Sequence, residues 1–259
     1  MNQAVRNLEK DAPGAALITG AARRIGRAIA QALSRRGYAV VLHANHSREE
    51  AETLAAAIVR DGGRATVVAG DLADAAAVSR IVPAAASFGK LTLLVNNASL
   101  FDEDEAATMT RERFERTLAV NLTAPLFLAQ AFAAQAPRDA SSSIVNIVDQ
   151  RVLRPTPKFF SYAMSKSALH AATTTLAQAF APLRVNSVAP GPTLPSPRQN
   201  ASQFAEQAAL MPLGRGPAPE EIAAAVVYLA DARSVTGVTI AVDGGQHLAW
   251  KTPDTDLIE

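Results

Sequence analysis

The chain has 259 residues, of which 49% are hydrophobic, 19% charged and 5% aromatic, a composition typical of a globular protein with a large core. The formal net charge is +1, and no run of lysines and arginines is long enough to track a phosphate backbone, so we expect no nucleic-acid partner. The absence of cysteine excludes disulfides, thiolate metal sites and a cysteine nucleophile.

Short apolar segments with strand character alternate with longer segments of helical spacing. We predict strands over residues 15–19, 38–43, 65–69, 92–96, 143–148, 183–188 and 237–242, and helical spacing over 49–60 and 111–134. Nearly continuous apolar strands are typical of a parallel sheet covered by helices on both faces. With no internal repeat or linker, the sequence predicts one doubly wound α/β domain over 1–259, with tails at 1–13 and 250–259.

The sequence also suggests where the protein resides. Residues 1–14 carry both signs of charge and no apolar stretch that could serve as a signal peptide. No segment reaches the roughly 20 apolar residues that a membrane span needs. We therefore expect a cytoplasmic protein without a membrane partner. The four histidines lack metal-ligand spacing, so we predict no metal site.

A glycine-containing turn follows the first predicted strand and leads directly into a helix, from Thr19 to Arg27. In open α/β sheets, ligands bind beyond the carboxyl ends of the strands, and a helix N-terminus offers free N–H groups to a pyrophosphate. Gly20 would allow the turn and Gly26 the close packing of the helix. A glycine pair alone is a weak signal, but its position after the first strand favours a dinucleotide site. Arg24 stands where the usual fingerprint has its middle glycine.

The end of the second strand indicates which nicotinamide cofactor is bound. A free ribose 2′-hydroxyl usually meets an Asp or Glu there, whereas this chain has His46, Ser47 and Arg48 before its first carboxylate, Glu49. With Arg23, these residues would offer donors and positive charge to a 2′-phosphate. We expect NADPH rather than NADH; the alternative is that these are ordinary polar loop residues.

Later strand ends and loops extend the predicted site. Asp71 and Leu72 follow the third strand, where the adenine edge would lie, and Asn97-Ala98-Ser99 follow the fourth, where the cofactor would cross the sheet. Four prolines and a glycine lie within residues 190–198, and we predict a substrate loop over 190–210. An ordinary solvent loop is the alternative.

Tyr162 and Lys166 are four residues apart, so on a helix they share one face. A nearby ammonium, helped by an oxidised nicotinamide ring, would stabilise the phenolate, which predicts a lowered pKa and a usable proton donor at Tyr162. This spacing often arises by chance. The other motifs of the sequence must therefore decide whether this pair belongs to an active site.

The ordered combination of the glycine turn, Asn97-Ala98, Asn121, Tyr162 with Lys166, Pro190-Gly191 and Val242-Asp243-Gly244-Gly245 resembles the short-chain dehydrogenase/reductases over about residues 14–249. The resemblance implies a Rossmann-like fold of seven parallel strands and a homotetramer. It also implies that Tyr162 transfers a proton, Lys166 holds the nicotinamide ribose and Asn121 organises a proton-relay water. The expected cofactor-binding residues are Gly20, Arg23, Arg24, Ile25, Gly26, His46, Ser47, Asp71, Leu72, Asn97, Ala98, Ser99, Tyr162, Lys166, Pro190 and Gly191.

Two departures from the family pattern indicate a particular branch of the short-chain dehydrogenase/reductases. Asp149 stands where a catalytic serine is usual, and Arg24 replaces a glycine. With Ser99 and Phe101, they make the chain similar to the pteridine reductases, including bacterial dihydromonapterin reductases, in which the aspartate belongs to the site. The resemblance implies that Phe101 lies against a pterin, that Ser99 contacts substrate or cofactor, and that Arg24 reaches the pyrophosphate and the pterin oxygen.

Alternatives remain for two of these residues. Phe101 could be a buried core aromatic, and Asp149 an ordinary strand-end carboxylate that caps a backbone N–H. His46 stands where the branch frequently has arginine, and this difference would weaken the preference for NADPH.

The sequence therefore predicts a small-molecule reductase that transfers hydride from NADPH to a dihydropterin and yields a tetrahydropterin, with Asp149, Tyr162, Lys166 and Asn121 as catalytic residues. An acid paired with a tyrosine suits protonation of a ring nitrogen, whereas a serine hydroxyl suits a carbonyl oxyanion. One alternative is a general carbonyl or 3-oxoacyl reductase, for which serine would be expected at position 149. Another is a non-catalytic NADPH-binding sensor.

Overall fold

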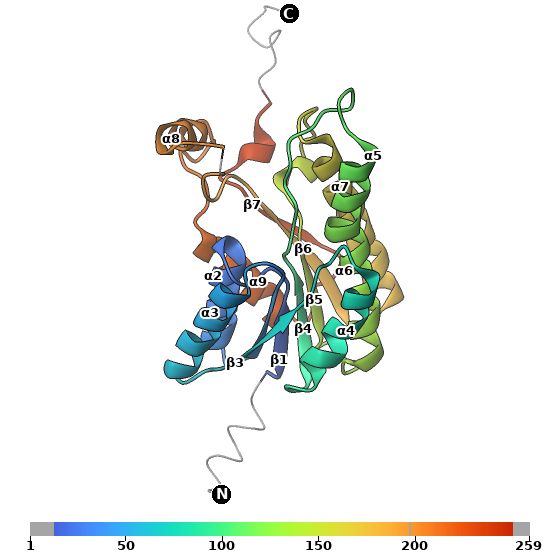
Figure 1. Cartoon of the computed structure of the whole chain (residues 1–259). Coiled ribbons are helices and arrows are strands. Elements are labelled where there is room, and N and C mark those ends of the chain that lie inside the picture. Colours follow the sequence, from blue (N-terminus) through green and yellow to red (C-terminus); the bar gives the residue numbers. More distant parts are fainter. Residues whose placement is uncertain (1–12, 197, 251–259) are drawn as a thin grey trace, which may run out of the picture.

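Seven parallel strands form one sheet in the order β3-β2-β1-β4-β5-β6-β7 (Figure 1). The computed structural model describes residues 13–196 and 198–250, so most of both predicted tails lies outside the described residues. The strands are β1 (Ala15–Ile18), β2 (Ala39–Ala44), β3 (Arg64–Ala69), β4 (Leu91–Asn96), β5 (Ser143–Ile147), β6 (Arg184–Pro190) and β7 (Thr239–Val242). The predicted fold class is confirmed, and the predicted strands coincide with the observed ones to within about two residues.

Helices cover both faces of the sheet (Figure 1). On one face lie α2 (Arg24–Arg35), α3 (Arg48–Arg60) and α9 (Pro219–Asp231). On the other lie α4 (Ala75–Ala86), α5 (Arg111–Leu118), α6 (Ala124–Gln135) and α7 (Phe160–Ala179). The short α8 (Ala201–Ala209) stands beyond the carboxyl ends of the strands and occupies the second half of the predicted substrate loop.

The core consists of two apolar layers, one on each side of the sheet. Every residue of β1, β2, β4, β5 and β6 is buried. Successive side chains of a strand point to opposite faces, so Ala16 and Ile18 join one layer while Ala15 and Leu17 join the other. This is why these strands read as continuous apolar runs rather than as alternating ones.

The segment with helical spacing over 111–134 is not one regular helix. Five residues, Ala119–Thr123, form a π-helical turn (η1) between α5 and α6. Such turns insert an extra residue into a helix and occur frequently at functional sites. Helical periodicity cannot reveal this insertion, because α6 is apolar around most of its circumference and so shows no shift of an apolar face.

The segment from Arg111 to Gln135 tests the prediction that no segment is apolar enough to span a membrane. By length and composition alone it is apolar enough to cross a membrane, with a mean hydropathy of 1.4 in its most apolar window. The prediction that no segment is that apolar is wrong by this criterion. However, 44% of the window is buried in the protein, and Leu128, Ala129 and Phe132 pack into the core. These contacts are those of a core helix.

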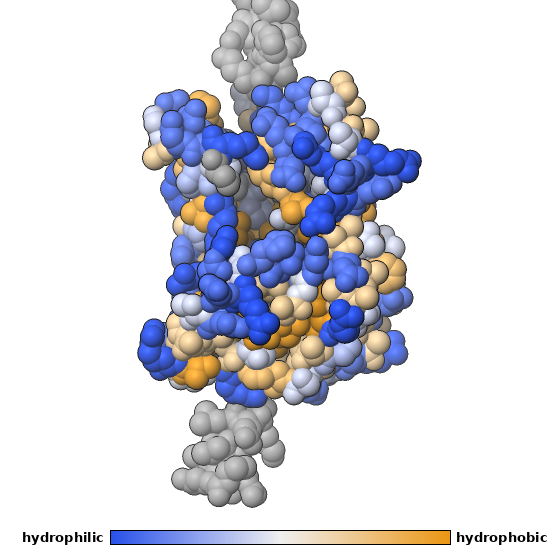
Figure 2. Space-filling view, in the orientation of Figure 1, coloured by the Kyte–Doolittle hydropathy of each residue, from blue (hydrophilic) through white to orange (hydrophobic). Residues whose placement is uncertain are grey.

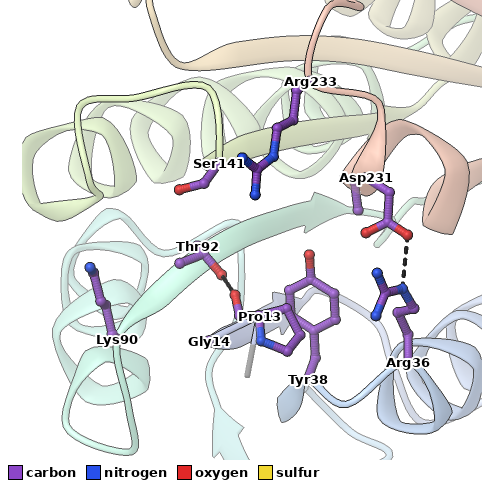
Figure 3. Close-up of a pocket in the computed structure, with 10 residues that line it drawn as sticks. Pro13, Gly14, Arg36, Tyr38, Lys90, Thr92, Ser141, Asp231 and Arg233 are labelled. Carbon is purple, nitrogen blue, oxygen red and sulfur yellow. Dashed lines mark hydrogen bonds and ion pairs between the residues drawn. The ribbon is translucent and has the colours of Figure 1, made fainter. Parts of the chain in front are cut away.

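A pocket of about 400 Å³ lies at the amino-terminal edge of the sheet, opposite the edge at which the strands end (Figure 3). Tyr38, which is 4% exposed, points its hydroxyl into it, and Arg233 reaches in from the far side. Arg36 lines the pocket but is paired with Asp231 at 2.8 Å. The pocket contains none of the predicted site residues, which lie at the carboxyl edge of the sheet.

Candidate active site

The carboxyl ends of β1, β4 and β5 bring together the segments that carry the predicted site residues. The glycine turn follows β1, Asn97 to Phe101 follow β4, and Asp149 follows β5. Figure 2 shows this end of the molecule hollowed between hydrophilic rims, with hydrophobic residues inside. In a doubly wound sheet, this is the edge at which ligands bind.

Tyr162 and Asp149 form the central contact. The Tyr162 hydroxyl donates a hydrogen bond of 2.8 Å to Oδ2 of Asp149. Tyr162 is buried in the first turn of α7, and Asp149 lies at the end of β5. The pKa of Tyr162 is raised well above its ordinary value, first because burial penalises the phenolate and then because of the charge of Asp149 and the hydrogen bond to it. The hydroxyl therefore keeps its proton.

Lys166 does not act on Tyr162 as the sequence suggested. Its Nζ donates to the carbonyl oxygen of Ile147 at 2.7 Å and lies 5.8 Å from the Tyr162 ring centre. Burial lowers the pKa of Lys166 to about 8, against the opposing influence of Asp149. The prediction that Lys166 lowers the pKa of Tyr162 is not met in this structure, because burial and the adjacent carboxylate raise it.

Asn121 occupies the π-helical turn and is fully buried. Its Oδ1 accepts the Leu100 N–H at 2.8 Å, while its Nδ2 donates to the Leu100 carbonyl at 2.9 Å and to Ser165 Oγ at 3.1 Å. The side chain thus joins the loop after β4 to the helix that carries Tyr162. Its predicted role in a proton relay stays a prediction.

The start of α7 is held from a distant loop. Phe159, the residue before the helix, has a left-handed backbone with φ of 57° and provides no side-chain cap. Instead the buried Asp104 accepts the Ser161 N–H at 3.0 Å and also the Ser161 hydroxyl. Asp104 thereby satisfies helix N–H groups that would otherwise be unpaired. The sequence offered no local signal for this cap, because 57 residues separate the partners.

Two phenylalanines form a stack beside Tyr162. The rings of Phe101 and Phe159 lie 4.4 Å apart at an angle of 10°, and Phe101 meets Tyr162 edge-on at 4.6 Å and 77°. Phe101 is therefore half-buried next to the Tyr162 ring rather than deep in the core. Phe159 was missed in the sequence, since its position against Phe101 depends on the approach of the loop after β4.

Two arginines flank this stack. The guanidinium carbon of Arg151 lies 5.5 Å from the ring centre of Phe101 and 5.3 Å from that of Phe159, and Arg198 lies at 5.4 and 5.2 Å from the same rings. Arg198 also donates to the Phe101 carbonyl at 3.3 Å. These distances are within the range of cation–π attraction. Neither arginine was singled out in the sequence.

The glycine turn is closely packed against the segment after β4. Gly20 has φ of +63°, and a Cβ at Gly26 would lie 2.2 Å from the Gly20 carbonyl oxygen and 2.7 Å from Asn97 Nδ2. That Nδ2 donates to the carbonyls of Thr19 and Gly20 at 2.9 and 3.1 Å. Arg23 at the N-cap of α2 provides no side-chain cap, so the first N–H groups of the helix are available to an anion.

The groups predicted around a 2′-phosphate lie at the start of α3 but are partly engaged. Arg23 pairs with Glu50, and Arg48 pairs with Glu52 at 2.7 Å. Ser47 is the N-cap residue of α3 and makes no side-chain cap. The two ion pairs are exposed, and such pairs are weak enough to be exchanged for a phosphate. The residues present therefore fit a dinucleotide that carries a 2′-phosphate.

Asp71, predicted at the adenine edge, accepts the Ala73 N–H at 2.9 Å and Arg116 Nη2 at 3.3 Å. The backbone hydrogen bond and, to a smaller degree, Arg116 lower the pKa of this carboxyl. Leu72 is buried beside it. The Asp71 carboxylate is thus oriented and ionised, but its contact with a cofactor stays a prediction.

Arg24 has an unusual backbone and a contact that the sequence did not suggest. Its φ is 51°, a conformation that costs free energy for any residue other than glycine. Its Nη1 donates to the Pro195 carbonyl at 2.9 Å and its Nη2 to the Leu194 carbonyl at 3.1 Å. Arg24 therefore joins the cofactor turn to the loop after β6. Its predicted contacts with a pyrophosphate and a pterin stay predictions.

The remaining predicted residues line the same edge. Ala98 donates its N–H to Thr19 Oγ1 at 3.0 Å, and the exposed Ser99 donates to the Leu100 carbonyl at 3.2 Å. Pro190 ends β6, and Gly191 donates to the Val242 carbonyl at 3.0 Å. Ile25 lies in the first turn of α2, and His46 is exposed just before α3. Within residues 13–196 and 198–250, no group of three or more His, Asp or Glu side chains could hold a metal ion.

The chain is similar to several known oxidoreductases. A family model described as enoyl-(acyl carrier protein) reductase matches residues 20–247. An uncharacterized oxidoreductase of Methylorubrum extorquens is 37% identical over 89% of this chain and 96% of its own length. A putative ketoacyl reductase of the granaticin polyketide synthase of Streptomyces violaceoruber is 35% identical over 92% of this chain and 98% of its own.

The chain is also similar to a pteridine reductase and to an alternative dihydrofolate reductase. Pteridine reductase 1 of Leishmania tarentolae is 33% identical over 90% of this chain and 96% of its own length. A crystal structure of FolM alternative dihydrofolate reductase 1 from Brucella canis, complexed with NADP, has a TM-score of 0.89 and 48% identity, and it covers 93% of this chain and 96% of that one.

Proposed function

Because the chain belongs to the short-chain dehydrogenase/reductase family, we propose that this oxidoreductase uses NADPH to reduce a dihydropterin to a tetrahydropterin. The observation that carries the proposal is the hydrogen bond of 2.8 Å between Tyr162 and Asp149, an aspartate where the family usually has serine. The similar pteridine reductase and the Brucella canis protein described as an alternative dihydrofolate reductase support it.

The reaction adds one hydride and one proton across a C=N bond of the reduced pterin ring. NADPH supplies the hydride to the ring carbon when bound, and the hydroxyl of Tyr162 supplies the proton to the ring nitrogen. Asp149 accepts the Tyr162 hydrogen bond and thus fixes the direction of the hydroxyl. A proton from solvent then returns to the Tyr162 oxygen, and the dihydropterin has gained two hydrogens in all.

Asp149 suits this chemistry better than it suits reduction of a ketone. A carbonyl oxygen that becomes an alkoxide needs hydrogen-bond donors around it, whereas an ionised carboxylate can only accept hydrogen bonds. A pterin presents amino and N–H groups that a carboxylate binds well. The stack of Phe101 and Phe159 offers an apolar, aromatic surface of the kind that a flat heterocycle packs against.

The cofactor assignment rests on the start of α2 and α3. The uncapped N-terminus of α2 offers N–H groups to a pyrophosphate, and Arg23 and Arg48 offer charge to a 2′-phosphate. Similar proteins crystallised with NADP or NADPH support this assignment, among them the Brucella canis structure. Lys166 and Asn121 would hold the nicotinamide ribose and a relay water.

A general carbonyl or 3-oxoacyl reductase is the second candidate, because the Streptomyces violaceoruber relative is described as a putative ketoacyl reductase. The two activities are separated by a substrate screen with NADPH that compares dihydromonapterin, dihydrobiopterin, dihydrofolate and keto compounds. The pterin proposal would be refuted if NADPH were oxidised in the presence of keto compounds but not in the presence of any pterin. Cofactor binding without turnover of any substrate would favour an NADPH-binding sensor.

The variant Asp149→Ser tests the role that the proposal assigns to Asp149. We expect it to lose pterin turnover while it still binds NADPH, because the acceptor that orients Tyr162 is replaced by a hydroxyl. Unimpaired pterin turnover would contradict the role assigned to Asp149. A gain of keto-compound reduction would indicate that position 149 chooses between the two chemistries.

We also propose that the protein acts in the cytoplasm as a homotetramer. Phe127 on α6 is 56% exposed and lines an apolar groove of about 410 Å³ between α4 and α6. Large exposed apolar groups in such a groove are typical of a protein interface. Light scattering of the purified protein, alone and as Phe127→Asp, tests whether four copies assemble and whether this face takes part.

A further inference from the structure

Arg151 is the one ionic partner of Asp149 among the described residues within 4 Å. It lies two residues after Asp149, in the single-turn helix η2 (Gln150–Val152). Its backbone N–H donates to Asp149 Oδ1 at 2.8 Å, and its Nη1 lies 3.2 Å from both carboxylate oxygens. Both side chains are largely buried, with 19% and 15% of their surfaces exposed.

The contacts divide the carboxylate between two partners. Oδ2 accepts the Tyr162 hydroxyl, and Oδ1 accepts the Arg151 N–H, with the guanidinium spanning both oxygens. A buried carboxylate is costly unless hydrogen bonds and a positive charge balance it. Arg151 supplies that charge directly. We propose that Arg151 is a positioning residue that holds the Asp149 carboxylate in the orientation in which its Oδ2 accepts the Tyr162 hydroxyl.

The other charged groups near Asp149 do not replace Arg151. Lys166, on α7, directs its ammonium to the Ile147 carbonyl and has a pKa lowered to about 8 by burial. His247, on the short helix η3 (Gln246–Leu248) that packs near η2, is paired with Asp243 at 2.7 Å. Arg151 also acts on Tyr162, since its charge opposes the influence by which Asp149 raises the pKa of Tyr162.

The position of Arg151 is costly, which is a sign that it serves the site. Its Nε is buried and has no hydrogen-bond partner among the described residues, and such an unpaired donor lowers stability. The guanidinium is nevertheless held beside the Phe101 and Phe159 rings at 5.5 and 5.3 Å. The aromatic stack therefore fixes the arginine, and the arginine fixes the carboxylate. This places Phe101 and Phe159 in the support of the proton-transfer pair.

The inference rests on the proposed proton-transfer role of Tyr162 and Asp149, and its test reads the position of the Asp149 carboxylate directly. In a crystal structure of Arg151→Met, we expect the carboxylate to turn away from Tyr162, so that the hydrogen bond of 2.8 Å between them is lost. We expect kcat for pterin turnover to fall with it, by up to about 10²-fold, because loss of orientation at a reacting group can cost that much, while KM changes less. An unchanged contact between Asp149 and Tyr162 would overturn the proposal.

Two further variants guard against misfolding as an explanation. Arg151→Lys keeps the charge but not the planar fork, and we expect it to recover part of the lost kcat. Arg154→Met removes an exposed arginine three residues further on and should leave the contact between Asp149 and Tyr162, and kcat, unchanged. Equal losses of kcat in Arg151→Met and Arg154→Met would overturn the specific role of Arg151.

Structure and kinetics together separate this inference from the proposed function. If the carboxylate turns away from Tyr162 in Arg151→Met and kcat does not fall, Arg151 positions Asp149 as inferred, but the proposed catalytic role of Asp149 fails.

Discussion

Asp104 caps the helix that carries Tyr162 by accepting both the N–H and the hydroxyl of Ser161. The backbone N–H of Phe160 also donates to the Asp104 carbonyl at 3.2 Å. The loop after β4 thus holds α7 one residue before the tyrosine. The same loop presents Phe101, so a single segment sets the position of both the aromatic surface and the proton donor.

We predict that Asp104→Ala lowers the free energy of unfolding by about 2 kcal/mol, since it removes a buried cap. It should also lower kcat, because Tyr162 loses its fixed position. Urea unfolding and steady-state kinetics measure the two effects. Thr110→Ala is a matched control, because Thr110 caps another helix, α5, at an exposed position. If both variants lower kcat equally, the cap has no specific role at the site.

Tyr162→Phe should lower kcat by about 10²–10⁴-fold, the usual range for loss of a general acid, with NADPH affinity little changed. The ring and its contact with Phe101 remain, so only the proton donor is lost. Stopped-flow measurements of NADPH oxidation and fluorescence titration of NADPH separate the chemistry from binding. Turnover near that of the parent would exclude Tyr162 as the donor.

Lys166 makes stability depend on pH. Its pKa in the folded protein is about 8, below the ordinary value of 10.5, so between these values the unfolded chain binds more protons than the folded one. Stability therefore rises with pH across this window. Relative to Lys166→Met, the parent should gain roughly 3 kcal/mol between pH 8 and 10.5. Denaturant unfolding at several pH values measures the difference, and a constant difference would refute the shift.

Gly26→Ala should weaken NADPH binding by at least about tenfold, because the added methyl group would clash with the Gly20 carbonyl and Asn97 and displace the start of α2. Gly89→Ala is the control, since a Cβ there would make only an ordinary contact of 3.5 Å with Ala15. Both are measured by cofactor fluorescence. Equal affinities in the two variants would show that the close packing at Gly26 does not matter for the cofactor.

Arg24→Gly should loosen the loop after β6 without lowering stability. Glycine adopts a positive φ at little cost, whereas the two hydrogen bonds to Leu194 and Pro195 are lost. We expect faster amide hydrogen exchange in residues 191–196 and a higher KM for the substrate. Exchange as slow as in the parent would mean that Arg24 does not hold this loop.

The strands, the glycine turn and the pair of Tyr162 and Lys166 could be predicted because their signals are local in the sequence. Apolar runs and a four-residue spacing survive without knowledge of the fold. Three other features could not be predicted, since each depends on segments that meet only in three dimensions. They are the cap by Asp104, the stack of Phe101 on Phe159, and the support that this stack gives to Asp149. The direction of the Tyr162 pKa was wrong for the same reason, because burial and the charge of Asp149 raise it, and both depend on the folded chain.

The π-helical turn at Ala119–Thr123 makes the number of residues between α5 and α6 part of the site. An α-helix advances by ~100° per residue, so deletion of one residue within the turn would swing α5 by about that angle relative to α6. Asn121 would then leave Leu100 and Ser165, even though no side chain of the site had been replaced. Variants of this protein can therefore exchange many residues in this stretch, but they must conserve its length.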